Sequence, residues 1–271
     1  MNFAFLDSGT GGIPYMLYLK KKAPQMKCAY LADSANFPYG EKTEAQITSC
    51  ASDAVSHIIK AWNPDAIVIA CNTISVTALD DLRARYPQVP IVGTVPAIKL
   101  AAEVSRNRRI GLLATNATVN HPYIKRLEHD FASDCTVFAR GDPDLVAFIE
   151  HDLFTATEHE KFEAVQPAVK YFAQYGCDTV ILGCTHFIHM AGIIQEAAGP
   201  AVKVVDSREG VANQALRVEK NQKKSPSSAA DGPEDCALYV TGFTQKKDAD
   251  EYSVLCRNLA IPFGGISSLK P

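Results

Sequence analysis

The stretches "IVIACNT" at residues 67–73 and "VILGCTH" at residues 180–186 follow the same pattern. In each, three apolar residues lead to a small residue, a cysteine and two polar residues. The two cysteines, Cys71 and Cys184, are 113 positions apart. Because short apolar runs with turn signals at their ends indicate buried strands, each cysteine is expected directly after such a strand, at its carboxyl end.

Similar apolar runs occur along the rest of the chain in a repeated order. The predicted strands are 3–6, 28–32, 66–70 and 90–92, then 110–113, 136–139, 179–183 and 203–205, and finally 238–241. Corresponding strands of the two halves are offset first by 107 and then by 113 residues. Segments with helical periodicity, such as 46–62 and 165–175, separate them. The pattern predicts an α/β fold in which two similar doubly wound parallel-sheet domains, related by duplication, face each other across a cleft.

The predicted domains do not follow the chain in simple succession. Residues 218–235 are polar and rich in Ser, Lys and Pro, which predicts an exposed, mobile loop. The strand and amphipathic helix after this loop are too short for a domain, so we expect them to pack on the first half. We therefore predict a discontinuous first domain, 1–96 plus 210–271, and a second domain, 97–209.

Composition excludes several classes of protein. The 271 residues are 47% apolar and 21% charged, and the net charge of −3 argues against a nucleic-acid partner. No apolar run reaches the roughly 18 residues of a membrane span, and no signal peptide is indicated, so we expect a cytoplasmic protein with reduced thiols. The eight cysteines include no C-x-x-C pair, which predicts neither a disulfide framework nor a metal site.

Polar residues gather where the predicted strands end. Ligands of open parallel sheets bind beyond the carboxyl ends of the strands. The residues found there are Asp7 and Ser8, then Pro38, Tyr39 and Gly40, then Asn72 and Thr73 beside Cys71, and Thr185 and His186 beside Cys184. Helix capping by the first pair and a plain surface turn at the next three are the alternatives. The glycine-rich "DSGTGG" at 7–12 lacks the pattern of a nucleotide site.

The paired cysteines suggest proton transfer. A thiol has a reference pKa of ~8.5, so thiol and thiolate are both accessible near neutral pH, and a helix N-terminus favours the thiolate. Two such groups on opposite sides of a ligand could remove a proton from one face of a carbon and return one to the other. Asp7 is the candidate helper of Cys71, and His186 that of Cys184.

The sequence resembles the glutamate racemase family of the aspartate/glutamate racemase superfamily. The matching motifs are "DSGTGG" at 7–12, "ANFPYGEKT" at 35–43, "ACNT" at 70–73, "ATNAT" at 114–118 and "GCTH" at 183–186. The resemblance implies a cofactor-independent, two-base racemisation of glutamate that supplies D-glutamate for peptidoglycan. It makes glutamate the expected small-molecule partner, and we expect a homodimer.

The resemblance also implies roles for individual residues. The catalytic residues would be Cys71, Cys184, Asp7 and His186. The substrate contacts would be Asp7, Ser8, Tyr39, Gly40, Asn72, Thr73, Thr115, Thr118, Thr185 and His186, with Glu150 and Pro38 as further candidates. His189 and Arg208 stand where the family usually has other residues, and we expect His189 to lie on a helix surface or to cap the helix.

Three alternatives stay open at this point. The same two thiols could serve a racemase of aspartate or another small acidic amino acid. A duplicated cleft could also belong to a non-catalytic amino-acid-binding protein, although such a protein needs no proton chemistry. A redox or metal protein using Cys71, Cys184 and His186 would require closer thiols than a substrate-filled cleft allows.

Overall fold

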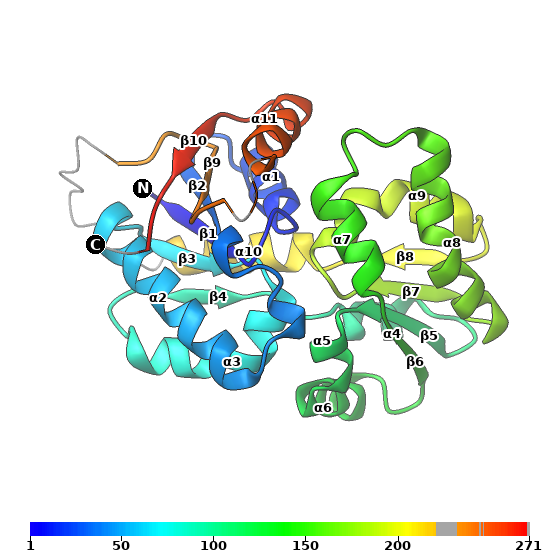
Figure 1. Ribbon diagram of the computed structural model, residues 1–271. Helices are drawn as coiled ribbons and strands as arrows, with labels where there is room; N and C mark the ends of the chain where they lie inside the picture. Colours follow the sequence, from blue (N-terminus) through cyan, green and yellow to red (C-terminus); the bar gives the residue numbers. More distant parts are fainter. Residues whose placement is uncertain (221–231, 244, 246, 270–271) are drawn as a thin grey trace. The chain divides into compact units, whose positions relative to one another are not determined.

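The computed structural model describes residues 1–220, 232–243, 245 and 247–269, and it divides into two compact units (Figure 1). The first unit is Met1–Thr94 together with Arg208–Pro271, and the second is Val95–Ser207. The domain limits of 1–96 with 210–271 and 97–209 stay a sequence-based prediction. Within the described ranges, no helix is both long enough and apolar enough to span a membrane.

The first unit contains a six-stranded sheet in which all neighbouring strands are parallel. Its strands, in spatial order, are β10 (Phe263–Ile266), β9 (Ala237–Val240), β2 (Cys28–Ala32), β1 (Phe3–Asp7), β3 (Ala66–Ile69) and β4 (Ile91–Gly93). The strands β1, β2 and β3 are buried at every residue. Continuous burial explains why these strands read as unbroken apolar runs in the sequence.

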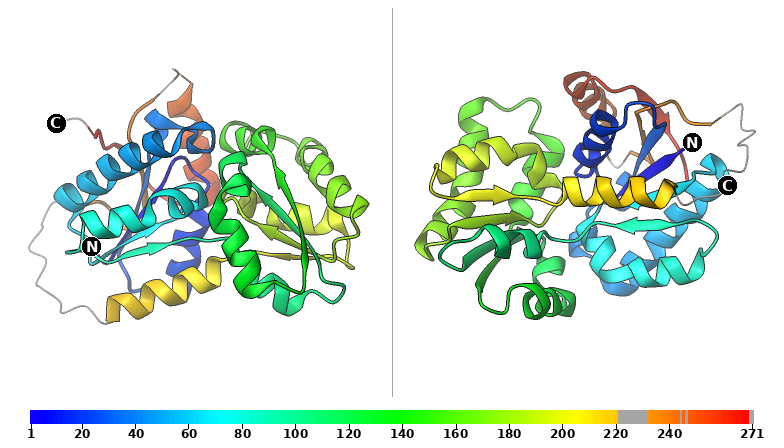
Figure 2. Two further views of the ribbon diagram at one scale, coloured as in Figure 1. Left: turned by 90° about the horizontal axis from the view of Figure 1, so that it is seen from below. Right: turned by 180° about the vertical axis from the view of Figure 1, so that it is seen from behind.

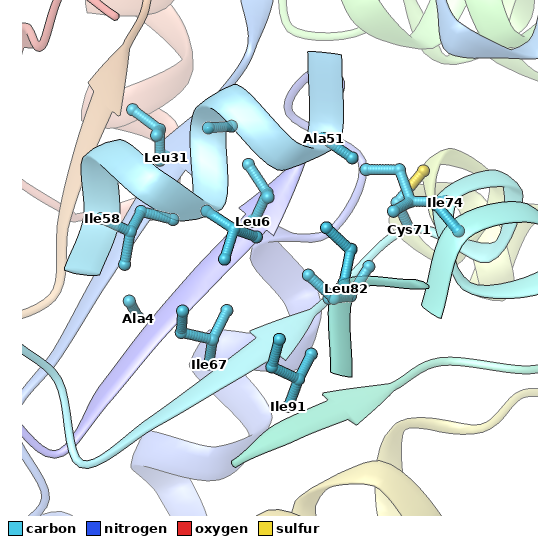
Figure 3. Packing of buried hydrophobic residues seen from close by; sticks show 14 of the residues in the cluster. Ala4, Leu6, Leu31, Ala51, Ile58, Ile67, Cys71, Ile74, Leu82 and Ile91 are labelled. Atoms are coloured by element: carbon cyan, nitrogen blue, oxygen red, sulfur yellow. The ribbon is translucent and has the colours of Figure 1, made fainter. Parts of the chain in front are cut away.

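Helices cover both faces of this sheet, as Figures 1 and 2 show. The helices are α1 (Ile13–Lys22), α2 (Glu44–Trp62), α3 (Asn72–Arg85), α10 (Arg208–Lys220) and α11 (Asp248–Leu259), with 3-10 turns η1 (Ser34–Asn36) and η2 (Tyr39–Glu41). Helices α2 and α3 pack together on one face, and α1 and α10 on the other. Figure 3 shows the core under α2 and α3, where Leu6, Ile67 and Ile91 from three strands meet Ile58 and Leu82.

The second unit contains a four-stranded sheet, which is also parallel throughout. Its strands, in spatial order, are β6 (Thr136–Gly141), β5 (Arg109–Ala114), β7 (Thr179–Leu182) and β8 (Lys203–Val205). Its helices are α4 (Ile98–Val104), α5 (Asn116–Asn120), α6 (Pro122–Phe131), α7 (Pro143–His151), α8 (Glu158–Gln174) and α9 (Ala191–Ala198), with the 3-10 turn η3 (His186–Met190). Helix α4 packs on α6, and α8 packs on α9.

The order of the strands repeats between the two sheets. The series β2-β1-β3-β4 of the first unit corresponds to β6-β5-β7-β8 of the second, in the same sequence order. The predicted class, two similar parallel-sheet α/β domains, is confirmed. The strands that precede Cys71 and Cys184, β3 and β7, occupy the same place in their respective sheets.

One sequence-based expectation about the C-terminal segment needs correction, and one strand there was not predicted. The predicted loop 218–235 begins too early, because α10 continues to Lys220 and buries Glu219. Positions 221–231 of that loop lie outside the described residues. The strand β10 was not expected, because "FGGI" contains two glycines and shows no strand pattern. It forms beside β9, where the neighbouring backbone supplies its hydrogen-bond partners.

A carboxylate at the start of β7 closes the turn between α4 and β5. Asp178 accepts hydrogen bonds from Ser105 Oγ at 2.6 Å and from the backbone N–H groups of Arg106 and Asn107 at 2.7 and 2.8 Å. Partial burial would raise the pKa of Asp178, but the bonds from Ser105, Asn107, Arg106 and Thr179 outweigh it and hold the pKa below its ordinary value. The ionised form therefore stabilises the turn.

Replacing Asp178 by Asn is expected to lower the free energy of unfolding at pH 7 by about 1–2 kcal/mol, because charge-assisted hydrogen bonds are lost. A carboxyl whose folded pKa is depressed stabilises the protein above its unfolded pKa of about 3.9, and the effect disappears as pH falls through the folded value. The difference between wild type and Asp178→Asn should therefore shrink below about pH 4. Urea denaturation across pH measures it, with Asp130→Asn, beside exposed His129, as the control.

Candidate active site

Cys71 lies between β3 and α3. It is the residue before the first turn of α3, it is 5% exposed, and its backbone is extended, while its carbonyl already accepts from Ser75 N at 3.0 Å. In Figure 3 its side chain lies at the end of the buried cluster, beside Ile74. A sulfur at this position experiences the positive end of the helix dipole, which favours the thiolate.

The next two residues, Asn72 and Thr73, are buried in the first turn of α3. Within the described residues, neither the amide nitrogen nor the carbonyl oxygen of the Asn72 side chain has a hydrogen-bond partner. A buried amide without partners is costly. Asn72 is therefore well suited to bind a polar ligand next to Cys71.

Asp7 ends β1, the strand directly beside β3, and it is fully buried. Its Oδ1 accepts from the backbone N–H of Ser8 at 2.7 Å, and the Tyr30 hydroxyl lies 3.4 Å from its Oδ2. The capping alternative is not what is observed, because α1 begins after Gly12 and no side chain caps it. A β-carbon at Gly12 would meet Ala70 at 2.5 Å, so only glycine lets α1 start this close to the end of β3.

The predicted loop after β2 contains Pro38, Tyr39 and Gly40. The peptide bond before Pro38 is cis, and Tyr39 and Gly40 form η2, which contacts α3. The Tyr39 side chain is fully buried, and its hydroxyl donates to Asp33 Oδ2. Burial and the nearby Asp33 carboxylate raise the pKa of Tyr39, so its hydroxyl stays protonated as a donor. The Tyr39 side chain is therefore held within the first unit.

Cys184 follows β7 in the second unit and is 4% exposed. A β-carbon at the preceding Gly183 would approach the Leu112 side chain to 2.6 Å, so this position requires a small residue. The Cys184 Sγ lies 3.7 Å from His186 Nδ1, and His186 Nε2 lies 2.9 Å from Glu150 Oε2. Helix α7 carries Glu150 and packs on η3, which carries His186. The unit thus contains a buried thiol–imidazole–carboxylate series.

The charge of His186 is set by its two partners. Burial alone would lower its pKa, but the hydrogen bonds to Cys184 and Glu150, together with the charges of these groups, raise the pKa of His186 well above its ordinary value. The geometry accounts for the raised pKa of His186, because both ring nitrogens face an acceptor and one of these is a buried carboxylate. An imidazolium at this distance can exchange a proton with the sulfur.

The remaining predicted residues of the second unit have ordinary structural partners as well. Thr115 precedes α5, and its hydroxyl accepts from Thr118 N at 3.2 Å while donating to Thr118 Oγ1 at 3.0 Å. Thr185 is buried beside Cys184. His189 is half-buried in η3, with its ring edge-on to Phe154. In the first unit, Arg208 starts α10 over the Tyr18 ring.

Other buried cysteines have a different environment. Burial raises the pKa of Cys28 to about 12 and the pKa values of Cys177 and Cys256 to about 11. These three side chains are therefore neutral thiols near pH 7 and serve as small apolar residues. In the described part of the chain, no group of three or more His, Cys, Asp or Glu side chains is placed to hold a metal ion.

Sequence reasoning did not single out Asp33. This residue directly follows β2, a position similar to that of Asp7 at the end of β1. Asp33 is fully buried and holds Tyr39. The signal was present, since an acidic residue directly after a buried apolar run is unusual unless its carboxylate has partners. Within the first unit, the structure places Asp7, Asp33 and Cys71 at the carboxyl ends of three neighbouring strands.

Each unit has a thiol just after the corresponding strand, Cys71 after β3 and Cys184 after β7. Asp7 ends the strand beside β3, and His186 is hydrogen-bonded to Cys184. Such groups suit proton transfer at carbon. One such group in each unit is what a two-base racemase requires.

Known proteins agree with this class. Residues 18–215 match the family described as Asp/Glu/Hydantoin racemase. A glutamate racemase from Treponema pallidum is 38% identical over 97% of this chain and 95% of its own length. The solved structure of Escherichia coli glutamate racemase, in complex with L-glutamate and the activator UDP-MurNAc-ala, has a TM-score of 0.82 and 27% identity, covering 98% of this chain and 97% of that chain. A Francisella tularensis glutamate racemase in complex with D-glutamate has a TM-score of 0.77 and 26% identity, covering 99% and 98%. The chain belongs to the glutamate racemase family, and it is an amino-acid racemase.

Proposed function

We propose that this protein interconverts L- and D-glutamate by a two-base mechanism that needs no cofactor, and that it supplies D-glutamate for peptidoglycan. The observation that carries the proposal is the buried series Cys184–His186–Glu150, with Cys71 at the equivalent strand end of the other unit. Glutamate is proposed because relatives over nearly the whole chain are glutamate racemases, and two solved neighbours hold its enantiomers.

In the proposed reaction, one thiolate removes the Cα proton, and the other thiol delivers a proton to the opposite face. His186 would exchange its Nδ1 proton with Cys184 Sγ, while Glu150 keeps the imidazole oriented through Nε2. Asp7 would play the corresponding part near Cys71, since it ends the neighbouring strand and is fully buried. Each thiol would thus have a helper of different chemistry.

Groups for binding the amino acid are proposed at the same strand ends. Asn72 is the strongest candidate because its buried amide lacks a partner within the described chain. The other proposed contacts are Asp7, Ser8, Thr73 and the Pro38–Gly40 turn in the first unit, and Thr115, Thr118, Thr185 and His186 in the second. Backbone N–H groups of the turn would receive a carboxylate of the substrate.

The proposal is tested by circular dichroism of L- and D-glutamate solutions with purified protein and no added cofactor. The signal of either enantiomer should decay to zero as the racemic mixture forms. A panel of enantiopure aspartate and other small acidic amino acids identifies the substrate. Binding of glutamate without Cα–H exchange in deuterated water would instead indicate a non-catalytic binding protein.

The homodimer and the cytoplasmic location expected from the sequence are also proposals. Light scattering of the purified protein across a concentration series tests the first. Fractionation of cells that express the full chain tests the second.

A further inference from the structure

The carboxylate of Asp33 is held entirely by uncharged donors. It is fully buried and accepts from Asn36 Nδ2 at 3.0 and 3.1 Å, from the Tyr39 hydroxyl, and from Thr241 Oγ1 at 2.7 Å. Among the described residues, no Lys, Arg or His pairs with it. A buried carboxylate in this situation depends on each neutral donor, because nothing else compensates for its lost hydration.

One of these donors comes from a distant part of the sequence. Thr241 directly follows β9, which pairs with β2, and its backbone N–H donates to Ala32 O at 3.0 Å. Its hydroxyl donates to Asp33 and accepts from the backbone N–H of Ala35 at 3.1 Å. The Thr241 hydroxyl therefore both donates and accepts a hydrogen bond in its contact with the loop.

A second pair of contacts joins the same two segments. Ser34 Oγ donates to the backbone carbonyl of Gly242 at 2.6 Å, and the N–H of Gly242 lies 3.4 Å from Ser34 Oγ. The start of the loop after β2 is thus bonded at three successive residues, Asp33, Ser34 and Ala35, to residues just after β9. Several buried hydrogen bonds make local opening of a loop less favourable.

The loop fixed in this way ends in the turn that contains Tyr39 and Gly40. Within the described part of the chain, the backbone N–H groups of Tyr39 and Gly40 have no hydrogen-bond acceptor. Because the Tyr39 ring is buried and its hydroxyl is bonded to Asp33, the direction of these N–H groups depends on where Asp33 is held.

We propose that Thr241 is a positioning residue for substrate binding, acting through Asp33 on the Tyr39–Gly40 turn. The C-terminal strand β9 then contributes to the site although it has no counterpart in the second sheet. The inference rests on the proposed function for its substrate, a dicarboxylic amino acid, while the positioning itself can be measured without substrate.

The decisive variant is Thr241→Val, which keeps the shape of the side chain and removes its hydroxyl. We expect KM for both glutamate enantiomers to rise about tenfold, with kcat changed about twofold or less, because binding groups are displaced while the thiols are not. Thr241→Ser should restore the wild-type KM. Thr179→Val is the matched control, since Thr179 is also buried and donates to a carboxylate, Asp178 at 3.0 Å, in the other unit.

A second measurement is independent of glutamate turnover. Hydrogen exchange of a peptide covering residues 33–43 should be about tenfold faster in Thr241→Val than in wild type, and unchanged in Thr179→Val. If Thr241→Val does not fold, Ser34→Ala removes the neighbouring contact to Gly242 and should give the same changes in a milder form.

The results separate the two proposals. A folded Thr241→Val protein with wild-type KM and wild-type exchange of residues 33–43 would overturn the positioning role of Thr241. A wild-type protein that racemises no glutamate would overturn the proposed function, and the exchange measurement alone would then decide the positioning.

Discussion

Replacing either Cys71 or Cys184 by Ala is expected to reduce racemisation of both glutamate enantiomers by at least about a thousandfold. The loss should be equal in the two directions, because a two-base reaction requires both thiols whichever enantiomer is the substrate. Circular dichroism of each enantiomer measures the loss. Substitution of a buried cysteine that acts only in packing should have no comparable effect.

The chain offers such controls in each unit. Cys256 in the first unit and Cys177 in the second are 4% and 5% exposed, and burial keeps both as neutral thiols. Cys256→Ala and Cys177→Ala should therefore keep racemisation within about twofold of wild type, apart from some loss of stability. Full turnover in either Cys71→Ala or Cys184→Ala would exclude the two-thiol mechanism.

Exchange of the Cα proton in deuterated water adds a stereochemical test. Each single-cysteine variant keeps one thiol, and this thiol can remove and return a proton on one face only. We expect Cys71→Ala to exchange one enantiomer and Cys184→Ala the other, without inversion in either. Mass spectrometry of recovered glutamate measures the exchange, and exchange of both enantiomers by one variant would contradict the assignment.

The second large effect is expected for Glu150→Gln. The substitution keeps the size of the side chain but removes the charge 2.9 Å from His186 Nε2. We expect kcat to fall about a hundredfold, because His186 then holds its proton less firmly and orients less well toward Cys184. The KM should change little, since Glu150 is placed to act through His186.

The direction of the pH effect follows from the cause of the shift. Hydrogen bonds and charge from Cys184 and Glu150 raise the pKa of His186, so loss of the Glu150 charge should lower it. Activity that depends on the imidazolium should therefore disappear at a lower pH in Glu150→Gln than in wild type. Carbon resonances of His186 followed by NMR through a pH titration test the same shift without turnover.

A matched control is Glu128→Gln in the same unit, where the carboxylate pairs with exposed Lys125. This variant should keep the wild-type pH profile. An unchanged His186 titration in Glu150→Gln would show that the carboxylate does not set the charge of the imidazole.

The sequence predicted those strands whose apolar residues are also buried in the structure. The strands predicted at 28–32 and 203–205 have the same bounds in the structure. Short apolar runs that are bounded by polar residues indicate a buried strand from the local sequence alone. The missed strand β10 contains Gly264 and Gly265. It exists because β9 offers an unpaired backbone, which is a tertiary cause without a local signal.

The candidate site divides in the same way. Position after a strand was enough to suggest Asp7, Cys71 and Cys184. Glu150 lies on α7, 36 residues before His186 in sequence, and only the family resemblance pointed to it. Thr241 required the pairing of β9 with β2, which no spacing in the sequence indicates.

The repeated strand order leaves the two sheets with different edges. In the first sheet, β9 and β10 extend the row beyond β2, while the equivalent strand β6 ends its own sheet. An edge strand exposes hydrogen-bonding groups that could recruit another chain, and charged side chains commonly discourage this. Arg140 of β6 lies over the Tyr171 ring, and Arg109 of the neighbouring β5 lies over the Phe138 ring of β6. Where the first sheet has two further strands, the second carries guanidinium groups at its border, so substitution of these arginines should affect solubility before it affects turnover.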